Sequence, residues 1–139
     1  MTQIWPATNS HPSDGYWVLT LPWCTPPLSL NDRMHWRPKS TWTKTLRQTA
    51  WALAKQAKIP PLPEGCQVTL MYEPPDHRRR DEDNLFATLK PLADGLVDAG
   101  VVADDTPDLM RKECRIINDP VQPSKLTLHV IANTGRWLW

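Results

Sequence analysis

The sequence has few of the residues that mark several common protein classes. Its three cysteines, Cys24, Cys66 and Cys114, are far apart and form no Cys-x-x-Cys pair, which argues against a disulfide framework and a zinc site. No run approaches the roughly 18 to 20 apolar residues of a membrane span, and no basic segment followed by an apolar stretch marks a secretory signal. These absences predict a protein without a membrane anchor in a reducing compartment, which we expect to be the cytoplasm.

The sequence also has little net charge, few glycines and few phenylalanines. The 139 residues have a formal net charge of +1 and include 5 Gly and 1 Phe, against 15 Pro and 8 Trp. With 40% hydrophobic and 22% charged residues the chain can bury one core, which argues against disorder, a collagen-like repeat and a coiled coil. We therefore expect a loose leader at residues 1–15 and a single globular domain over residues 16–139.

The small net charge is the sum of two oppositely charged segments. Residues 33–58 contain seven basic side chains and no acidic one, a charge of +7. Residues 73–113 contain eleven carboxylates and six basic side chains, a net charge of −5. The basic segment is suited to contact with a phosphate backbone, and the crowded carboxylates favour a bound cation. The sequence thus predicts a nucleic-acid partner despite its near-neutral total.

Alternating and helical patterns of apolar residues predict six elements. In chain order they are a strand over residues 16–21, a helix from about residue 41, a strand over 66–72, a helix over 84–98, and strands over 109–117 and 126–131. The order β-α-β-α-β-β predicts an α+β fold, a two-layer sandwich in which a mixed sheet of about four strands has two helices on one face. A Pro-rich loop over residues 22–40, longer than a simple connection needs, precedes the first helix.

The first predicted helix has an apolar stripe and a basic face. Ser40 or Thr41 can cap its start, and Pro60 ends it. Trp42, Leu46, Ala50, Leu53 and Ala57 form the stripe, while Lys44, Arg47, Lys55 and Lys58 lie largely off it.

The second predicted helix contains a proline. Four leucines recur at helical spacing from Leu85 to Leu96, and Gly100 is the expected terminator. Pro91 would remove the hydrogen bond to the carbonyl of residue 87. We therefore expect either a kink at Pro91 or a helix that begins only about one turn before it.

Two short acidic runs flank this helix. Asp81 and Asp83 follow a predicted strand, and alternation in an extended segment places their side chains on the same side. A hard divalent cation such as Mg²⁺ or Mn²⁺ is the usual partner of two such carboxylates. The second run is Asp104-Asp105. A helix of roughly 22 Å and a return segment of at most about 25 Å make convergence of Asp105 with the first pair feasible.

The residues around these runs resemble those of a known family. The chain reads Arg78-Arg79-Arg80-Asp81-Glu82-Asp83-Asn84-Leu85, then Lys90, Asp94-Gly95-Leu96 and Gly100-Val101-Val102-Ala103-Asp104-Asp105. In order and spacing these elements resemble the RusA family of Holliday junction resolvases, common in phages and prophages, and the likeness extends from about Tyr16 to Ile131. Lys90 lies three residues further along than the lysine of the family's best-known member, a shift close to one helical turn.

The resemblance implies a homodimeric, magnesium-dependent endodeoxyribonuclease that makes paired cuts in four-way DNA junctions. It implies Asp81, Asp83, Asp105 and Lys90 as catalytic residues, with Asp81, Asp83 and Asp105 as metal ligands and Asp104 as a supplementary ligand. Lys90 would stabilise transition-state charge, and Asp94 would orient Lys90. The expected DNA contacts are Arg78, Arg79, Arg80, Arg33, Arg37, Lys39, Lys44 and Arg47.

Other interpretations of the same residues remain open. Asp81 and Asp83 would also suit a solvated acidic turn, and Lys90 a purely structural pair with Asp94. A calcium loop of the EF-hand type is excluded, because Leu85 stands where its third oxygen ligand is needed. Two functional alternatives are a non-catalytic phage protein that binds branched DNA and a metal-stabilised structural subunit with no nucleic-acid role.

Overall fold

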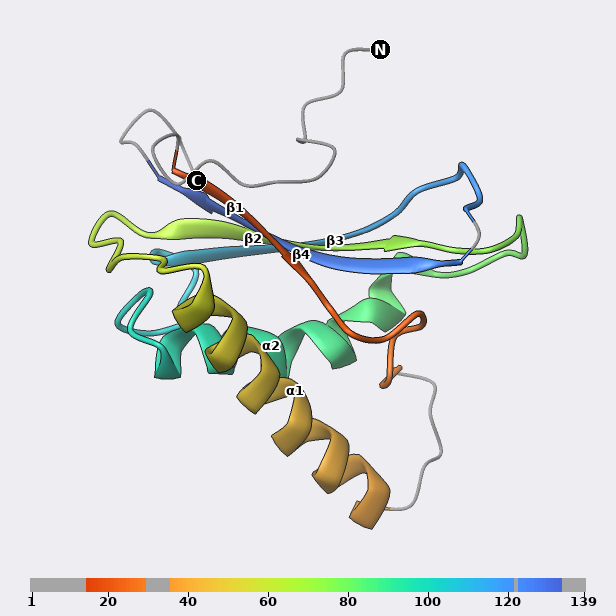
Figure 1. Ribbon diagram of the computed structural model, residues 1–139, viewed down its shortest axis with the longest axis horizontal. Helices are drawn as coiled ribbons and strands as arrows, with labels where there is room; N and C mark the ends of the chain where they lie inside the picture. Colours follow the sequence, from red (N-terminus) through yellow and green to blue (C-terminus); the bar gives the residue numbers. More distant parts are fainter. Residues whose placement is uncertain (1–14, 30–35, 122, 134–139) are drawn as a thin grey trace.

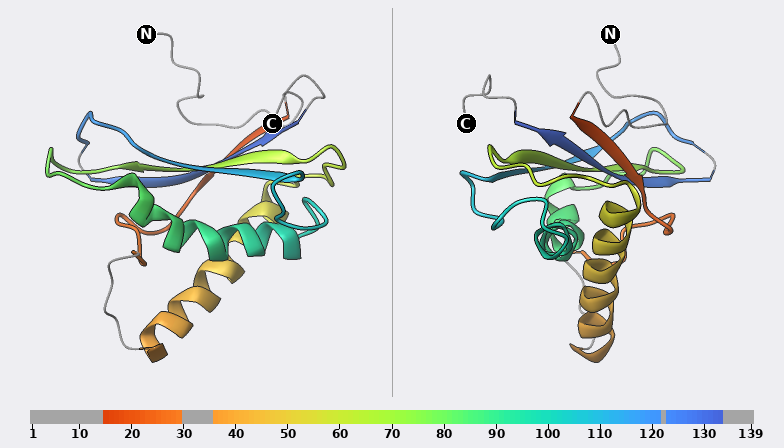
Figure 2. Two further views of the ribbon diagram at one scale, coloured as in Figure 1. Left: turned by 180° about the vertical axis from the view of Figure 1, so that it is seen from behind. Right: turned by 60° about the vertical axis from the view of Figure 1, so that its left-hand side comes forward.

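The computed structural model describes residues 15–29, 36–121 and 123–133 and has the expected α+β architecture (Figure 1). A four-stranded sheet forms one layer and two helices, both on one face of the sheet, form the other (Figure 2). The predicted leader, residues 1–15, lies outside the described residues apart from Gly15. The elements in chain order are β1 (Tyr16–Thr20), α1 (Trp36–Gln56), β2 (Cys66–Glu73), the 3₁₀ helix η2 (Glu82–Leu85), α2 (Phe86–Asp98), β3 (Met110–Ile116) and β4 (Lys125–Ala132).

The sheet is mixed, with the strand order β1-β4-β2-β3. β4 is antiparallel to both β1 and β2, whereas β2 and β3 are parallel and are joined through α2, the crossover that a parallel pair requires. Tyr72 near the end of β2 is in register with Ile116 at the end of β3. The carboxyl ends of these two strands therefore meet at one edge of the molecule, where η2 begins.

The core lies between the helices and the helix-facing side of the sheet. Side chains alternate along a strand, so Val68 of β2 and Leu128 of β4 face the helices, and both are fully buried. The predicted stripe of α1 is confirmed: Leu46 and Ala50 are fully buried, and Trp42, Leu53 and Ala57 pack at the border of the core. In the part of the chain that the structure describes, no helix has the length and apolarity needed to cross a bilayer.

Helix α1 begins at Trp36, earlier than the sequence predicts. The predicted cap at Ser40 or Thr41 is wrong, because Pro38 is part of the helix. A proline in the first turn removes no helical hydrogen bond, since the first four N–H groups of a helix have no partner within it. The Pro-rich connection is correspondingly shorter than residues 22–40.

Helix α2 begins at Phe86, after the 3₁₀ turn of η2, and contains Pro91 near its start. Of the two expected alternatives, the structure shows the late start of the α-helix. The helix ends as predicted at Gly100, whose φ of 83° places it in the left-handed region. The N–H groups of Gly100 and Val101 donate to the carbonyls of Val97 and Leu96 at 2.9 and 3.1 Å, which closes the last turn.

The two helices cross at Gly95. A Cβ atom at this position would collide with the carbonyl oxygen of Arg47 and the Cβ of Ala50, both on α1. The absence of a side chain at Gly95 thus allows the two backbones to approach. Beyond the crossing, the N-terminal half of α1 projects away from the sheet (Figure 2).

Candidate functional site

The first acidic run lies at the edge where β2 ends and η2 begins. Asp81 caps η2: its backbone is extended, with φ −100° and ψ 121°, and its Oδ1 accepts the N–H of Asp83 at 3.0 Å. A side chain that bonds to the backbone two residues ahead fixes a local turn. Both carboxylates are exposed and remain close together because they belong to the same turn.

The carboxylates share a cavity with the arginine run. The cavity has a volume of about 760 Å³, and Asp81, Glu82 and Asp83 line it together with Arg78, Arg79 and Arg80. We call it the acidic cavity. Groups that can hold a cation and groups that can bind a phosphate thus occupy one concave surface.

Arg80 is bound by groups at the end of β2 and in the segment that follows it. Its Nη2 lies 2.9 Å from Oδ1 of Asp76, its Nη1 donates to the carbonyls of Asp76 and Arg78, and its guanidinium lies 5.7 Å from the ring centre of Tyr72. The Arg78 N–H and the Arg80 side chain, both bonded to Asp76, lower the pKa of that carboxyl. Arg79 is exposed and makes no ion pair with the described residues, so its guanidinium is available for a ligand.

Glu82, to which the sequence assigns no role, connects η2 to the sheet. Its Oε2 accepts the backbone N–H of Ile116 at 2.9 Å, at the end of edge strand β3. This bond fixes the acidic turn relative to β3. A signal for it is hard to find in the sequence, because any of the three neighbouring carboxylates could have made the bond.

The second acidic run is engaged elsewhere. Oδ2 of Asp105 accepts hydrogen bonds from Nζ of Lys90 at 2.5 Å and from Nζ of Lys112 at 3.0 Å. These two bonds lower the pKa of Asp105 to about 2. Lys90 also contacts Asp94 at 3.1 Å, which confirms the expected i, i+4 pair, and its own pKa is raised, chiefly by Asp105. Asp104 accepts the N–H of Asp105 at 2.8 Å.

Lys112 is a site residue that sequence reasoning missed. The alternation along β3 places it on the helix-facing side, between Met110 and Cys114, which are both buried. A lysine at such a position needs a partner, and this was the available signal.

The expected convergence of three aspartates is not found. Within residues 15–29, 36–121 and 123–133, no three His, Cys, Asp or Glu side chains come together in an arrangement that could hold a metal ion. Asp105 is instead bound by Lys90 of α2 and Lys112 of β3. The residues nevertheless suit Mg²⁺ in a smaller set, since this ion is often held by one or two carboxylates together with water and substrate phosphates. Asp81 and Asp83 supply such a pair.

The predicted DNA contacts on and before α1 divide into three groups. Arg33 and the side chain of Arg37 lie outside the described residues. Lys39 and Lys44 are exposed on the projecting half of α1, without an ion pair in the described part of the chain. Arg47 has a different role, because its Nε and Nη2 bind Asp98 of α2 at 2.5 and 2.8 Å and so link the two helices.

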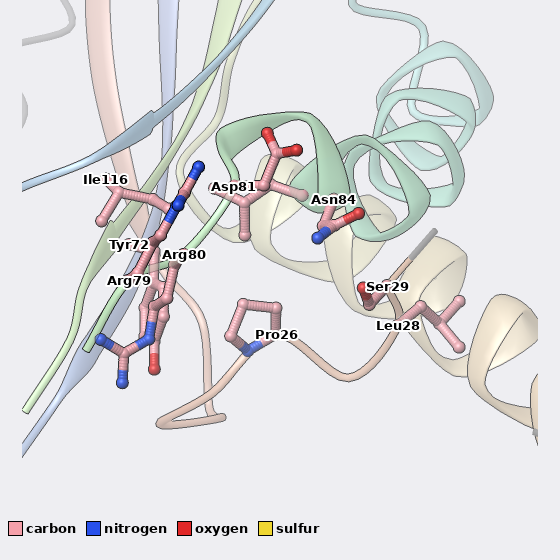
Figure 3. Close-up of a pocket in the computed structure, with 10 residues that line it drawn as sticks. Pro26, Leu28, Ser29, Tyr72, Arg79, Arg80, Asp81, Asn84 and Ile116 are labelled. Carbon is pink, nitrogen blue, oxygen red and sulfur yellow. The ribbon is translucent and has the colours of Figure 1, made fainter. Parts of the chain in front are cut away.

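A second cavity of about 510 Å³ adjoins the acidic cavity (Figure 3). The residues after β1 form one wall, and the end of β2 and η2 form the others. Arg79, Arg80 and Asp81 line both cavities. We call it the Tyr72 cavity, after the buried aromatic residue in its wall.

Comparison with known proteins shows a partial likeness. No family model matches the sequence. The chain is 35% identical over 85 residues to an uncharacterized protein of Xylella fastidiosa (strain Temecula1 / ATCC 700964). The aligned region covers 58% of this chain and 56% of that protein. The chain thus spans a little over half the length of this relative, whose name states no activity.

Proposed function

We propose that this protein is a magnesium-dependent, structure-selective endodeoxyribonuclease that resolves four-way DNA junctions in recombination and repair, as a homodimer in the cytoplasm. The observation that carries this proposal is the acidic cavity, in which the carboxylates of Asp81 and Asp83 stand beside the arginines of residues 78–80. In metal-dependent phosphodiester hydrolysis the bound ion activates a water and stabilises phosphoryl charge, and neighbouring cationic side chains bind the phosphates. The resemblance to the RusA family supports the same reaction.

Each group in the acidic cavity has a part in this chemistry. Asp81 and Asp83 would hold Mg²⁺, or Mn²⁺ in its place, which supplies a nucleophilic water near neutral pH and stabilises charge on the phosphoryl oxygens. Arg79, whose guanidinium makes no ion pair with the described residues, would bind a phosphate. Arg80, fixed by Asp76 and Tyr72, would present a cation whose position needs no reorganisation when DNA binds.

The role of Lys90 and the second acidic run depends on whether the ion pairs of Asp105 are broken. Asp105, with Asp104 beside it, would join the ligand set only by leaving Lys90 and Lys112. While these ion pairs persist, Asp105 holds the side chain of Lys90 in place. Lys90 then lies roughly 10 Å from Asp83, measured along the helix axis.

A homodimer suits the proposed substrate. A four-way junction has approximate two-fold symmetry, so a C2 dimer with one site in each subunit would place two cuts symmetrically.

The direct test is cleavage of a mobile four-way junction labelled on each strand, with Mg²⁺ or with a chelator. We expect paired nicks that require the metal. Asp81→Asn and Asp83→Asn should abolish cutting while retaining or improving junction binding, because fewer negative charges face the phosphates. Glu64→Gln, which changes an exposed carboxylate in the connection before β2, is the matched control and should cut normally. Absence of nicks in junctions, duplexes and single strands, with either metal, would refute the proposal.

One observation favours a second candidate, a non-catalytic protein that binds branched DNA. Asp105 is already neutralised by two lysines, which leaves only two of the three implied ligands at the acidic cavity. Calorimetric titration with Mg²⁺ or Mn²⁺ separates the two candidates. A protein that only binds DNA needs no metal at Asp81 and Asp83. Replacing these residues would then not change the heat measured when Mg²⁺ or Mn²⁺ is added.

A further inference from the structure

The Tyr72 cavity is built from segments that are tied together. Oγ1 of the fully buried Thr88 on α2 accepts the N–H of Leu28 at 3.1 Å and donates to the carbonyl of the same residue at 2.7 Å. These reciprocal bonds fix the segment that contains Pro26 and Leu28 against α2. On the opposite side, Glu82 binds the N–H of Ile116, another lining residue. The walls are therefore set before any ligand arrives.

The cavity combines apolar and planar surfaces with a few polar groups. Pro26, Leu28, Leu85 and Ile116 line it, and Tyr72, only 5% exposed, lies beneath the guanidinium of Arg80. Figure 3 shows Arg79 and Arg80 on one side of the cavity, Pro26 below, and Asn84 and Ser29 on the other side.

Asn84 is the polar group best placed to select a ligand. Its backbone N–H caps the turn by donating to the Asp81 carbonyl at 3.1 Å, which fixes where the side chain starts. Its amide makes no hydrogen bond with the described residues, although the residue is partly buried. An amide offers both a donor and an acceptor to a ligand edge.

We propose that the Tyr72 cavity binds one unstacked nucleobase of the DNA, next to the phosphate that occupies the acidic cavity. This inference rests on the proposed function, since its ligand is a base of the same substrate. A base needs flat partners for its faces, which the Arg80 guanidinium and the Pro26 ring provide, and a polar partner for its edge, which Asn84 provides. The cavity volume of about 510 Å³ lies within the range of small-ligand sites.

Because the Tyr72 cavity adjoins the acidic cavity, a bound base would affect where the DNA backbone lies. Arg79, Arg80 and Asp81 belong to both cavities, so a base in one brings its own phosphate to the carboxylates of the other. The captured base thus decides which phosphodiester lies at Asp81 and Asp83. Branched DNA supplies such a base at low cost, because stacking is already interrupted at the branch point.

The test uses two four-way junctions that differ only in the presence of one nucleobase. Each carries a single unpaired nucleotide at the branch point, a thymidine in one and an abasic sugar in the other. Their affinities are measured by fluorescence anisotropy in a chelating buffer, so that no cutting occurs. We expect the full chain to bind the thymidine junction at least about fivefold more tightly, from the usual contribution of stacking one base.

Two variants and one control assign this preference to the cavity. Asn84→Leu keeps the side-chain volume and removes the amide, and Ser29→Trp fills the cavity; both should abolish the preference but still bind the abasic junction. Asn133→Ala, at the opposite end of the sheet from Tyr72, should retain it. Equal binding of both junctions by the unaltered protein overturns the base site and leaves the proposed function standing. Failure to bind any junction overturns both.

Discussion

Asp105 is a carboxylate with two competing uses. Its Oδ2 lies between Nζ of Lys90 on α2 and Nζ of Lys112 on β3, and its side chain is only 17% exposed. As it stands, the ion pair connects α2 to the sheet. As a metal ligand, the same carboxylate would have to exchange the lysines for a cation.

Replacing Lys112 separates these uses. Lys112→Met removes one competing cation, so a ligand role for Asp105 predicts Mn²⁺ binding tighter by about fivefold, the equivalent of about 1 kcal/mol for one partly buried pair. Calorimetric titration measures the change. Lys44→Met, which removes an exposed lysine from α1, should leave the affinity unaltered. Unchanged binding in Lys112→Met would assign Asp105 to structure alone.

His129 gives the fold a pH dependence unrelated to the carboxylates. The ring is 3% exposed, with Nδ1 2.8 Å from Tyr16 Oη and Nε2 3.0 Å from Thr127 Oγ1, and burial lowers its pKa to about 4. The unfolded chain binds this proton at a higher pH, near 6.5, so this contribution to stability is complete above that value and decreases as the pH falls toward 4.

We therefore expect the free energy of unfolding to fall by about 2 kcal/mol between pH 7 and pH 5 because of this one residue. Urea denaturation at both pH values measures it. His129→Gln should remove most of the difference, whereas His77→Gln, at an exposed position, should not. A drop that persists in His129→Gln would show that another group is responsible.

At the scale of single residues, the sequence predicts contacts that are local in the chain. Asp81 and Asp83 are close together as expected, but the expected extended segment is wrong, because Asp83 lies in the 3₁₀ helix η2 and Asp81 caps it. The pairing of Lys90 with Asp94 follows from helix geometry alone. The pairing of Arg47 with Asp98 does not, because the two residues are 51 positions apart and meet only where the helices cross. For this reason Arg47 is expected on a DNA-binding face from the sequence and is found in an interhelical ion pair.

At the scale of elements, the crossing of α1 and α2 depends on Gly95. Gly95→Ala would improve helix propensity by about 1 kcal/mol but would drive a methyl group into the α1 backbone at Arg47. Overpacking of this kind costs about 1 to 3 kcal/mol, and more where backbone must move, so we expect net destabilisation in urea denaturation. Gly100→Ala, where nothing lies within 4 Å, should cost only the roughly 1 to 2 kcal/mol of its left-handed backbone. A more stable Gly95→Ala would contradict the close approach.

The order of elements is predictable because each has a clear period, and all four strands are found within a few residues of their predicted bounds. Boundaries at prolines are less predictable. Pro38 and Pro91 both lie inside helices. Pro38 is in the first turn, where its missing N–H removes no bond, whereas Pro91 removes the bond to the carbonyl of residue 87 and the helix continues past it. The Tyr72 cavity has no sequence signal, because its walls come from four segments that only the packing of α2 on the sheet brings together.

At the scale of the whole molecule, the near-zero net charge is divided between two regions of the structure. The carboxylates of residues 81–83 lie where α2 begins, and the start of α1 lies at the same end of the molecule (Figure 1). Lys39 and Lys44 are exposed on the projecting half of α1, whereas Lys55 and Lys58 are at its other end. A DNA backbone that reaches the acidic cavity would therefore meet the first pair of lysines and not the second.

This arrangement predicts how junction binding depends on salt. Each phosphate contact contributes about −0.9 to the slope of log K against log salt concentration. Replacing both Lys39 and Lys44 by Gln should make that slope less steep by nearly 2, measured by anisotropy across a salt series in a chelating buffer. Replacing Lys55 and Lys58 by Gln changes the net charge equally and should leave the slope unaltered. If the two double variants gave the same slope, the effect would be one of overall charge, and the projecting half of α1 would not be the surface along which the DNA lies.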